Sequence, residues 1–529
     1  MAGFRKPDVA REQLVLWTHR LDDSLPADHS ARLVDELFGS SAFKPLFADW
    51  ARQYHLLEGQ PPYHPRDLAM LYCYCMLNRI RSSRQMECAC SNRLDVIWLM
   101  SGQKPDHSTI SAFVRANHKR VKDLFGQVVR VGIEAGLITL RHEAVDGTNI
   151  EASAGRGLVY KESTILKQDQ DIEKEIAQLE KEYQDNERRE GLLCVTDAAD
   201  VPEDERLRRL REKRGRLRQA LGAIQRRRDE KSREDVPDPK PIASTTDPDS
   251  RVMKDKEGRS KPNYNAQVVV DAGEGGALMI VAADVNDAAN DSGQLMEMIA
   301  QTQETCGKLP EEFSADAGYN TGRELADLEE QKIRAYVADK SDGIRTKENQ
   351  DAVRAVREGR TLSLPQIEAL PIDPHTKLLH RSCFAYNQQA DIYRCPAGQT
   401  LTLFRMGKRY DREGGLERKR YKTAACGTCQ LASRCCKNPI KGREINQTEF
   451  EGVKQRMRDR MKSDEGRARY GLRGQGVEPR IGVLKSVMGV RKFLRRGLAS
   501  VKSEWLWACL SLNIGILLRH PDRIRSVMQ

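Results

Sequence analysis

HEAVDGTNIEA, residues 142–152, is the stretch from which we infer the fold. Its residues alternate as in a short β-strand, with an acid, Asp146, at the centre. Two further strand patterns, AQVVVDA (266–272) and ALMIVAADV (277–285), flank the Gly-rich turn GEGG and predict a β-hairpin. These segments predict a sheet that is interrupted by an insertion.

The chain after this hairpin alternates helix and strand patterns. A predicted helix over residues 292–306 is followed by EEFSADAGYN (311–320), a strand that ends on Asp316. A second helix, over 321–331, precedes the strand IRAYVAD (333–339). This order of elements is typical of a mixed α/β sheet.

Changes in the predicted secondary structure and in the cysteine content divide the chain into four parts. Residues 1–135 are predicted to form a helical N-terminal domain, and residues 136–344 the first part of the sheet domain. Residues 345–445 form a cysteine-rich insertion, and residues 446–529 return to the sheet domain with C-terminal helices.

Two parts of this plan have alternative interpretations. A turn at Pro105 and Asp106, followed by a helix with basic residues, suits helix-turn-helix contact with DNA, but an ordinary surface helix explains it too. Within 160–235, heptad spacing of Ile and Leu predicts an antiparallel coiled-coil hairpin. Its second arm is strongly basic, either as a solvated face or as an arm for DNA or dimerisation.

Composition limits the class of protein. Lys and Arg number 88 against 77 Asp and Glu, a net charge of +11 that favours a polyanionic partner. No apolar run is long enough to span a membrane, and the N-terminus lacks an apolar signal core, so we expect a cytoplasmic protein. Thirteen cysteines, an odd number, favour thiols or metal ligands over a disulfide framework.

The cysteines fall into two sets. Cys426 and Cys429 form a Cys-x2-Cys pair, and with Cys395 and Cys435 they predict a structural Zn²⁺ site. A redox dithiol or buried packing cysteines are the alternatives, and Cys436 or Cys383 could replace one ligand. The N-terminal set, spaced i, i+2 on apolar helices, is expected in the core: Cys73, Cys75, Cys88 and Cys90.

Acidic residues carry the predicted chemistry. Asp146 and Asp316 are each expected to end a strand, and Glu478 lies in a helical, basic C-terminal stretch. If the three carboxylates converge, they can hold two Mg²⁺ ions, which take oxygen ligands and serve in phosphoryl transfer. Three acids placed together also need cations, because their repulsion raises their pKa values.

Four motifs occur in a distinctive order: VDGTNIEA, YNAQVVVDAGEGG, SADAGYN and a Tyr-x2-Arg…Glu-x6-Lys pattern. In this order they resemble bacterial insertion-sequence transposases of the DDE, RNase H-like class. The N-terminal region, the C-terminal helix RKFLRRGLASVKSEWLWACLSLNI and the cysteine module, which is similar to a zinc-ribbon-like insertion, extend the resemblance over most of the chain. The spacing departs from the common signature at Arg473, which four residues separate from Glu478 instead of three.

The resemblance implies a catalytic triad of Asp146, Asp316 and Glu478 on an RNase H-like sheet, with two Mg²⁺ ions. It also implies that Tyr470, Arg473 and Lys485 contact DNA. The expected function is binding of transposon ends, cleavage and strand transfer on double-stranded DNA, by a homodimer or larger assembly. Two alternatives remain, namely a metal-dependent nuclease without strand transfer and a non-enzymatic, zinc-stabilised DNA-binding protein.

Overall fold

The computed structural model describes residues 20–54, 61–190, 205–231, 241–254, 258–339, 347–373, 376–387, 389–411 and 414–528. It divides into two compact units. Unit 1 comprises Met1–Ile138, Val483–Val490 and Ser503–Gln529, and unit 2 comprises Thr139–Gly482 and Arg491–Lys502.

Unit 1 is helical, as expected. Its N-terminal helices are η1 (Leu21–Ser24), α1 (Ser30–Gly39), α2 (Lys44–Ala51), α3 (Pro65–Leu77), α4 (Ser83–Asn92), α5 (Leu94–Leu99), α6 (His107–Ala116) and α7 (Arg120–Glu134). The C-terminal part of the chain adds the π-helical turn η6 (Val483–Val487), most of α17 (Leu498–Leu517) and α18 (Pro521–Met528). Trp50, Trp505 and Trp507 are fully buried and form the largest side chains of its core.

Local signals in unit 1 explain where two helices begin. Asp106 caps α6, because its carboxylate accepts a hydrogen bond from the Thr109 amide at 2.6 Å. Pro65 begins α3, where a missing N–H costs nothing. The predicted burial of the N-terminal cysteines is confirmed for three of them, but Cys88 is exposed because it lies on the outer side of α4.

Among the described residues, no single helix has the length and apolar composition to cross a membrane. The bent pair of α17 and α18 meets that test when the two are taken together, by length and composition only. Most α17 side chains are buried, which is also typical of a core helix.

The central sheet of unit 2 confirms the predicted mixed α/β arrangement. Its order is β4-β5-β1-β7-β8, and β6 also pairs with β5. β5 runs antiparallel to β1, β4 and β6, whereas β7 runs parallel to β1 and β8. The strands are β1 (His142–Glu151), β4 (Arg251–Lys254), β5 (Ser260–Asp271), β6 (Ile280–Asn286), β7 (Glu312–Ala315) and β8 (Arg334–Val337). β5 and β6 form the predicted hairpin.

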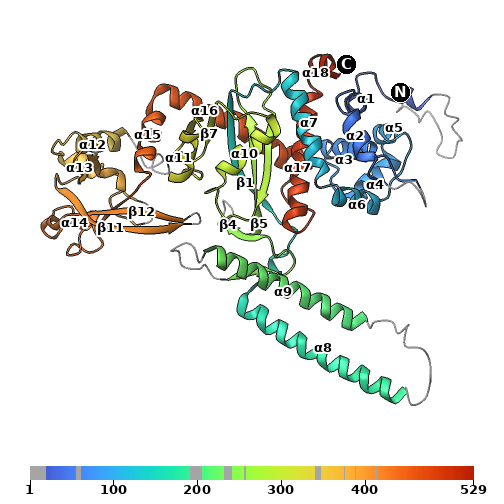
Figure 1. Ribbon diagram of the computed structural model, residues 1–529, viewed down its shortest axis with the longest axis horizontal. Coiled ribbons are helices and arrows are strands. Elements are labelled where there is room, and N and C mark those ends of the chain that lie inside the picture. Colours follow the sequence, from blue (N-terminus) through green and yellow to red (C-terminus); the bar gives the residue numbers. More distant parts are fainter. Residues whose placement is uncertain are drawn as a thin grey trace, which may run out of the picture. The chain divides into compact units, whose positions relative to one another are not determined.

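Helices pack against this sheet (Figure 1). α10 (Leu295–Cys306) contacts β5 and β6, and α11 (Gly322–Glu330) contacts β8. α15 (Glu451–Lys462) also contacts β8. α16 (Asp464–Gly482) contacts β1, β5, β7 and β8, so a C-terminal segment returns to the centre of the sheet.

The first insertion consists of two long helices, which Figure 1 shows side by side. α8 (Glu162–Glu190) and α9 (Glu205–Lys231) bury Ile165, Ile172 and Leu217 in a shared apolar cluster. Arginines of α9 pair with acids of α8, for example Arg206 with Glu175. The 3-10 turn η2 (Arg156–Leu158) and the small sheet of β2 (Val159–Lys161) and β3 (Ile242–Ser244) join this pair to the core. The pairing agrees with a hairpin, while the coiled-coil geometry stays a prediction.

The second insertion has its own sheet and core. The strand order is β13-β12-β11-β10-β9, and an apolar cluster that includes Leu379, Leu401 and Tyr421 packs beneath it. Its strands are β9 (Ala385–Asn387), β10 (Ile392–Arg394), β11 (Thr400–Asp411), β12 (Gly414–Lys422) and β13 (Ile445–Thr448). Its helical segments are α12 (Lys347–Arg357), α13 (Leu364–Glu368), η4 (Arg381–Cys383), η5 (Ala424–Thr428) and α14 (Ala432–Cys435).

Candidate active site

Two of the predicted acids lie on neighbouring strands. β1 and β7 are parallel, with Ala144 beside Ser314, so Asp146 and Asp316 follow that pair at equivalent positions. The expectation that Asp146 ends its strand is wrong, because β1 continues to Glu151 along β5. Asp316 does follow the end of β7.

Arg473 joins the third acid to the first. On α16, its Nη1 lies 3.1 Å from Oδ2 of Asp146, and its Nη2 lies 3.5 Å from Oε1 of Glu478. The guanidinium is 13% exposed, whereas Glu478 is 61% exposed. One arginine therefore links a strand carboxylate to a helix carboxylate that is distant in the sequence, despite the unusual spacing between Arg473 and Glu478.

Burial and neighbouring charge set the acidity of Asp146. Burial raises its pKa to about 6, Arg473 opposes this rise, and the negative charge of Asp316 adds to it. Both aspartates also fold back on the backbone, since Asp146 accepts from the Gly147 amide at 2.9 Å and Asp316 from the Gly318 amide at 2.7 Å. The carboxylates of Asp146 and Asp316 therefore repel each other, and a nearby cation is needed to keep both ionised.

The donor chemistry of this site fits a divalent cation. Carboxylate oxygens from three acids are the ligands that Mg²⁺ prefers. Arg473 lies beside Asp146 and Glu478, where it provides the positive charge that a bound metal ion would otherwise supply. Within the described ranges, no three acidic, His or Cys side chains are already arranged as a metal-holding group.

A further carboxylate, missed by the sequence analysis, lies at the same place. Asp291 precedes α10, and its Oδ1 accepts hydrogen bonds from Asn265 Nδ2 at 2.8 Å and Gln267 Nε2 at 2.7 Å. Gln267 is fully buried, and its Oε1 accepts a hydrogen bond from the Tyr319 hydroxyl. This polar network connects β5, the loop before α10 and the turn that carries Asp316.

Two glycines make room for Asp291. A Cβ at Gly147 would overlap Asp291 Oδ1, and a Cβ at Gly318 would lie 3.0 Å from Asp291 Oδ2. The available signals were the polar Asn265 and Gln267 within an apolar strand, which lie on one face at a spacing of two. Only the fold shows that this face meets Asp291.

The other signature residues divide between the two units. The Tyr470 ring lies under the Arg473 guanidinium, 5.6 Å from ring centroid to Cζ, so Tyr470 supports that arginine. Lys485 lies in the π-helical turn η6, which belongs to unit 1. Its role stays a prediction.

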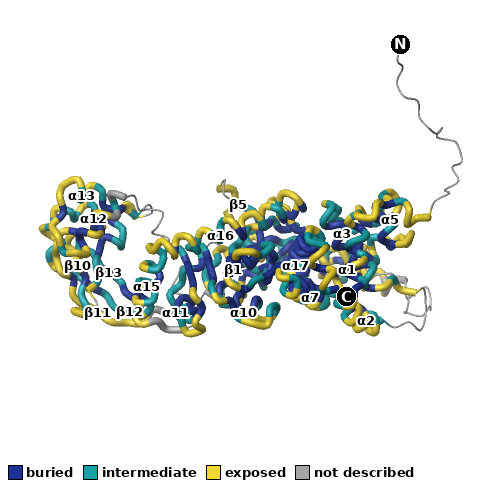
Figure 2. The backbone as a smooth tube through the Cα atoms, turned by 90° about the horizontal axis from the view of Figure 1, so that it is seen from above, coloured by how far each residue is buried: buried dark blue, intermediate teal, exposed yellow. Residues whose placement is uncertain are grey.

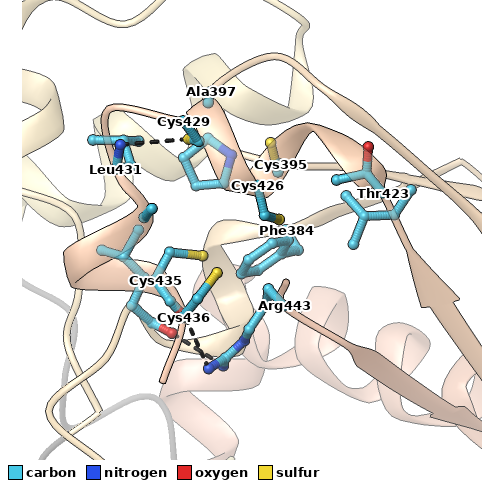
Figure 3. Close-up of a pocket in the computed structure, with 14 residues that line it drawn as sticks. Phe384, Cys395, Ala397, Thr423, Cys426, Cys429, Leu431, Cys435, Cys436 and Arg443 are labelled. Carbon is cyan, nitrogen blue, oxygen red and sulfur yellow. Dashed lines mark hydrogen bonds between the residues drawn. The ribbon is translucent and has the colours of Figure 1, made fainter. Parts of the chain in front are cut away.

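The cysteine module brings all four predicted ligands to one small pocket. Cys395, Cys426, Cys429 and Cys435 line it together with Cys436 (Figure 3). Backbone amides donate to two of the sulfurs, Gln399 to Cys395 at 3.3 Å and Leu431 to Cys429 at 3.4 Å. The sulfurs of the described chain do not already form a three-ligand metal group, so zinc stays a prediction.

Comparison with protein families gives evidence for the class of this protein that is independent of the site geometry. Residues 394–518 match the model of a transposase DDE domain, and residues 19–116 match that of a transposase domain, DUF772. Two segments of the chain are therefore similar to transposase domains, and the DDE domain identifies a phosphoryl-transfer enzyme of a class that uses divalent metal ions. The DDE match includes Glu478 but begins after Asp146 and Asp316. No curated protein matches the chain.

Proposed function

We propose that this chain binds transposon ends and catalyses cleavage and strand transfer of DNA, with Asp146, Asp316 and Glu478 as its catalytic acids. The observation that carries the proposal is the bridge by Arg473 between Asp146 and Glu478, beside the parallel strands that present Asp146 and Asp316. Arg473 thereby places the helix acid and the strand acid at one locus.

Two Mg²⁺ ions held by these carboxylates would activate the attacking oxygen and stabilise the leaving oxygen of a phosphodiester. The chain contributes the geometry: β1 and β7 fix two aspartates side by side, and α16 carries Glu478 on an exposed side chain. Glu478 can therefore swing towards the aspartates when cations relieve the repulsion. Arg473 would then be free to bind a phosphate oxygen, with Tyr470 supporting its guanidinium.

The remaining functional assignments are part of the same proposal. Lys485 contacts phosphates, and the protein acts in the cytoplasm on double-stranded DNA as a dimer or larger assembly. Cys395, Cys426, Cys429 and Cys435 hold structural zinc; the shared pocket and the two amide-to-sulfur hydrogen bonds support this.

The test is a parallel measurement of DNA binding, cleavage and strand transfer. Asp146→Asn, Asp316→Asn and Glu478→Gln keep side-chain size but remove one negative ligand each. We expect binding to persist and cleavage in Mg²⁺ to collapse by at least about 10²-fold, with double variants costing little more.

The outcomes separate the alternatives. Cleavage without joining to a second DNA would identify a nuclease. Unchanged activity in Asp146→Asn would remove the triad assignment, and joint loss of binding and folding would make the acids structural.

A further inference from the structure

The hairpin of β11 and β12 presents an unusual charged surface. Arg405 lies directly opposite Arg420, Gly407 opposite Arg418, and Thr402 opposite Lys422. Directly opposed residues of an antiparallel pair point to the same face, and so do residues two apart. Arg405, Arg418, Arg420 and Lys422 therefore share one face, which we name the cationic face.

Positive side chains predominate on the described part of this face. Its described side chains on β11 and β12 include no acid; Glu417 lies on the opposite face, beside Lys408. Arg420 has a carboxylate partner beyond the two strands, Glu444, at 3.4 Å. Like charges directly opposed across a ladder destabilise it, so the Arg405–Arg420 pair weakens the isolated hairpin. A polyanion would reverse that effect.

Exposed apolar side chains accompany these cations. The register shifts between Leu403 and Arg405, so Phe404 is the extra residue of a β-bulge and is 61% exposed. Met406 is 58% exposed, and every residue from Thr402 to Lys408 is exposed (Figure 2). Lys422 Nζ lies 5.4 Å from the Phe404 ring centroid, so the ring is next to the cationic face.

The base of the hairpin is anchored rigidly. Tyr421 is fully buried, its ring contacts Tyr393 at 5.0 Å between centroids, and its hydroxyl donates to Asp391 at 2.5 Å. Lys419 also pairs with Asp391, at 3.0 Å. The exposed segment is therefore a two-stranded ribbon that extends from a fixed support.

We infer that this ribbon enters a groove of duplex DNA, with the cationic face against phosphates and Phe404 against bases or sugars. The inference rests on the proposed function and assigns part of its DNA contact to the second insertion. The major groove of B-form DNA admits a two-stranded ribbon, whereas that of A-form RNA is too narrow. Charge complementarity favours a nucleic acid as the binding partner, and the width of the groove favours duplex DNA over duplex RNA.

The test compares two variants that lose the same charge. Arg405→Gln with Arg420→Gln removes two ribbon cations, and Arg206→Gln with Arg211→Gln removes two cations that pair with Glu175 and Glu180 of α8. Affinity for a random-sequence duplex is measured in EDTA over a salt series. The ribbon variant should bind on the order of tenfold more weakly and reduce the slope of log K against log salt by nearly 2, about 0.9 for each lost phosphate contact. The α9 variant should change little.

Two additional measurements distinguish a loss of DNA contact from a loss of folding. The thermal unfolding temperature of the ribbon variant should not fall below that of the parent, because the variant removes a pair of opposed like charges. Phe404→Ala should weaken DNA binding without changing the slope of log K against log salt. Equal losses in both charge variants, preferential loss of RNA binding, or altered self-association with unchanged DNA affinity would each overturn the inference. Because these measurements need no cleavage, they can fail while Asp146→Asn still abolishes chemistry, and the converse also holds.

Discussion

Asp291 is held between two backbone segments, one that follows Asp146 and one that follows Asp316. Its Oδ1 is occupied by two amide donors, and glycines stand at the two points of closest approach. From this geometry we expect Asp291 to be a positioning residue, which influences the separation of Asp146 and Asp316 through its approach to Gly147 and Gly318.

Two substitutions of Asp291 distinguish a role in positioning its neighbours from a requirement for its negative charge. Asp291→Asn keeps an acceptor oxygen for Asn265 and Gln267, so we expect cleavage near the parent rate. Asp291→Ala removes the acceptor that both amides share and should lower the cleavage rate by about 10–100-fold, with DNA binding retained. Single-turnover cleavage with parallel binding measures both. Equal losses in the two variants would instead show that the negative charge of Asp291 is required.

At the scale of elements, the second arm of the helical pair illustrates how a partner changes the meaning of a basic pattern. Arg206, Arg211 and Arg228 of α9 pair with Glu175, Glu180 and Glu162 of α8, which favours the interpretation of α9 as a paired helical face over that of a DNA arm. The ribbon of β11 and β12 has the opposite character, because four cations share a face on which the described side chains of these strands include no acid.

The cysteine module makes an element-scale prediction. If zinc joins η5 and α14 to β10, Cys429→Ser should release about one equivalent of zinc per chain and loosen only this module. Elemental analysis and hydrogen exchange measure the two effects, and Cys88→Ser, at an exposed position of α4, is the matched control. Purified parent protein without zinc would contradict the assignment.

At the scale of the whole molecule, a buried carboxyl group in the sheet unit makes the free energy of unfolding depend on pH. Glu143 on β1 is fully buried, neither carboxylate oxygen has a hydrogen-bond partner, and it lies opposite Asp271. Burial, then the charge of Asp271, raises the pKa of Glu143 to about 9 from 4.5. The folded state therefore favours the neutral acid.

This pKa shift predicts the direction of a pH effect. The unfolded chain releases the Glu143 proton near pH 4.5, so the favourable contribution of the neutral acid is complete below that pH and is lost as pH rises towards about 9. Relative to Glu143→Gln, parent stability should fall by up to about 1.4 kcal/mol per pH unit within this window. Urea unfolding of both proteins at pH 5 and pH 8 measures the difference. Parallel pH curves would show that Glu143 is charged in the fold.

The mixed sheet, the β5–β6 hairpin and the helical N-terminal region could be predicted from the sequence. These depend on local periodicity and on turn residues such as GEGG, which act between near neighbours. The same patterns placed Asp146, Asp316 and Glu478 on their elements, although β1 extends past Asp146 because β5 pairs with its whole length.

Which of these residues lie in contact is evident from the folded chain alone. The contact of Arg473 with Asp146, the position of Asp291 between two glycines and the pairing of the α9 arginines all join segments distant in the sequence. Such contacts depend on the register of strands and on helix packing, which no local pattern encodes. The chemical groups of the candidate site are therefore evident from the sequence, whereas the distances between them follow from the fold.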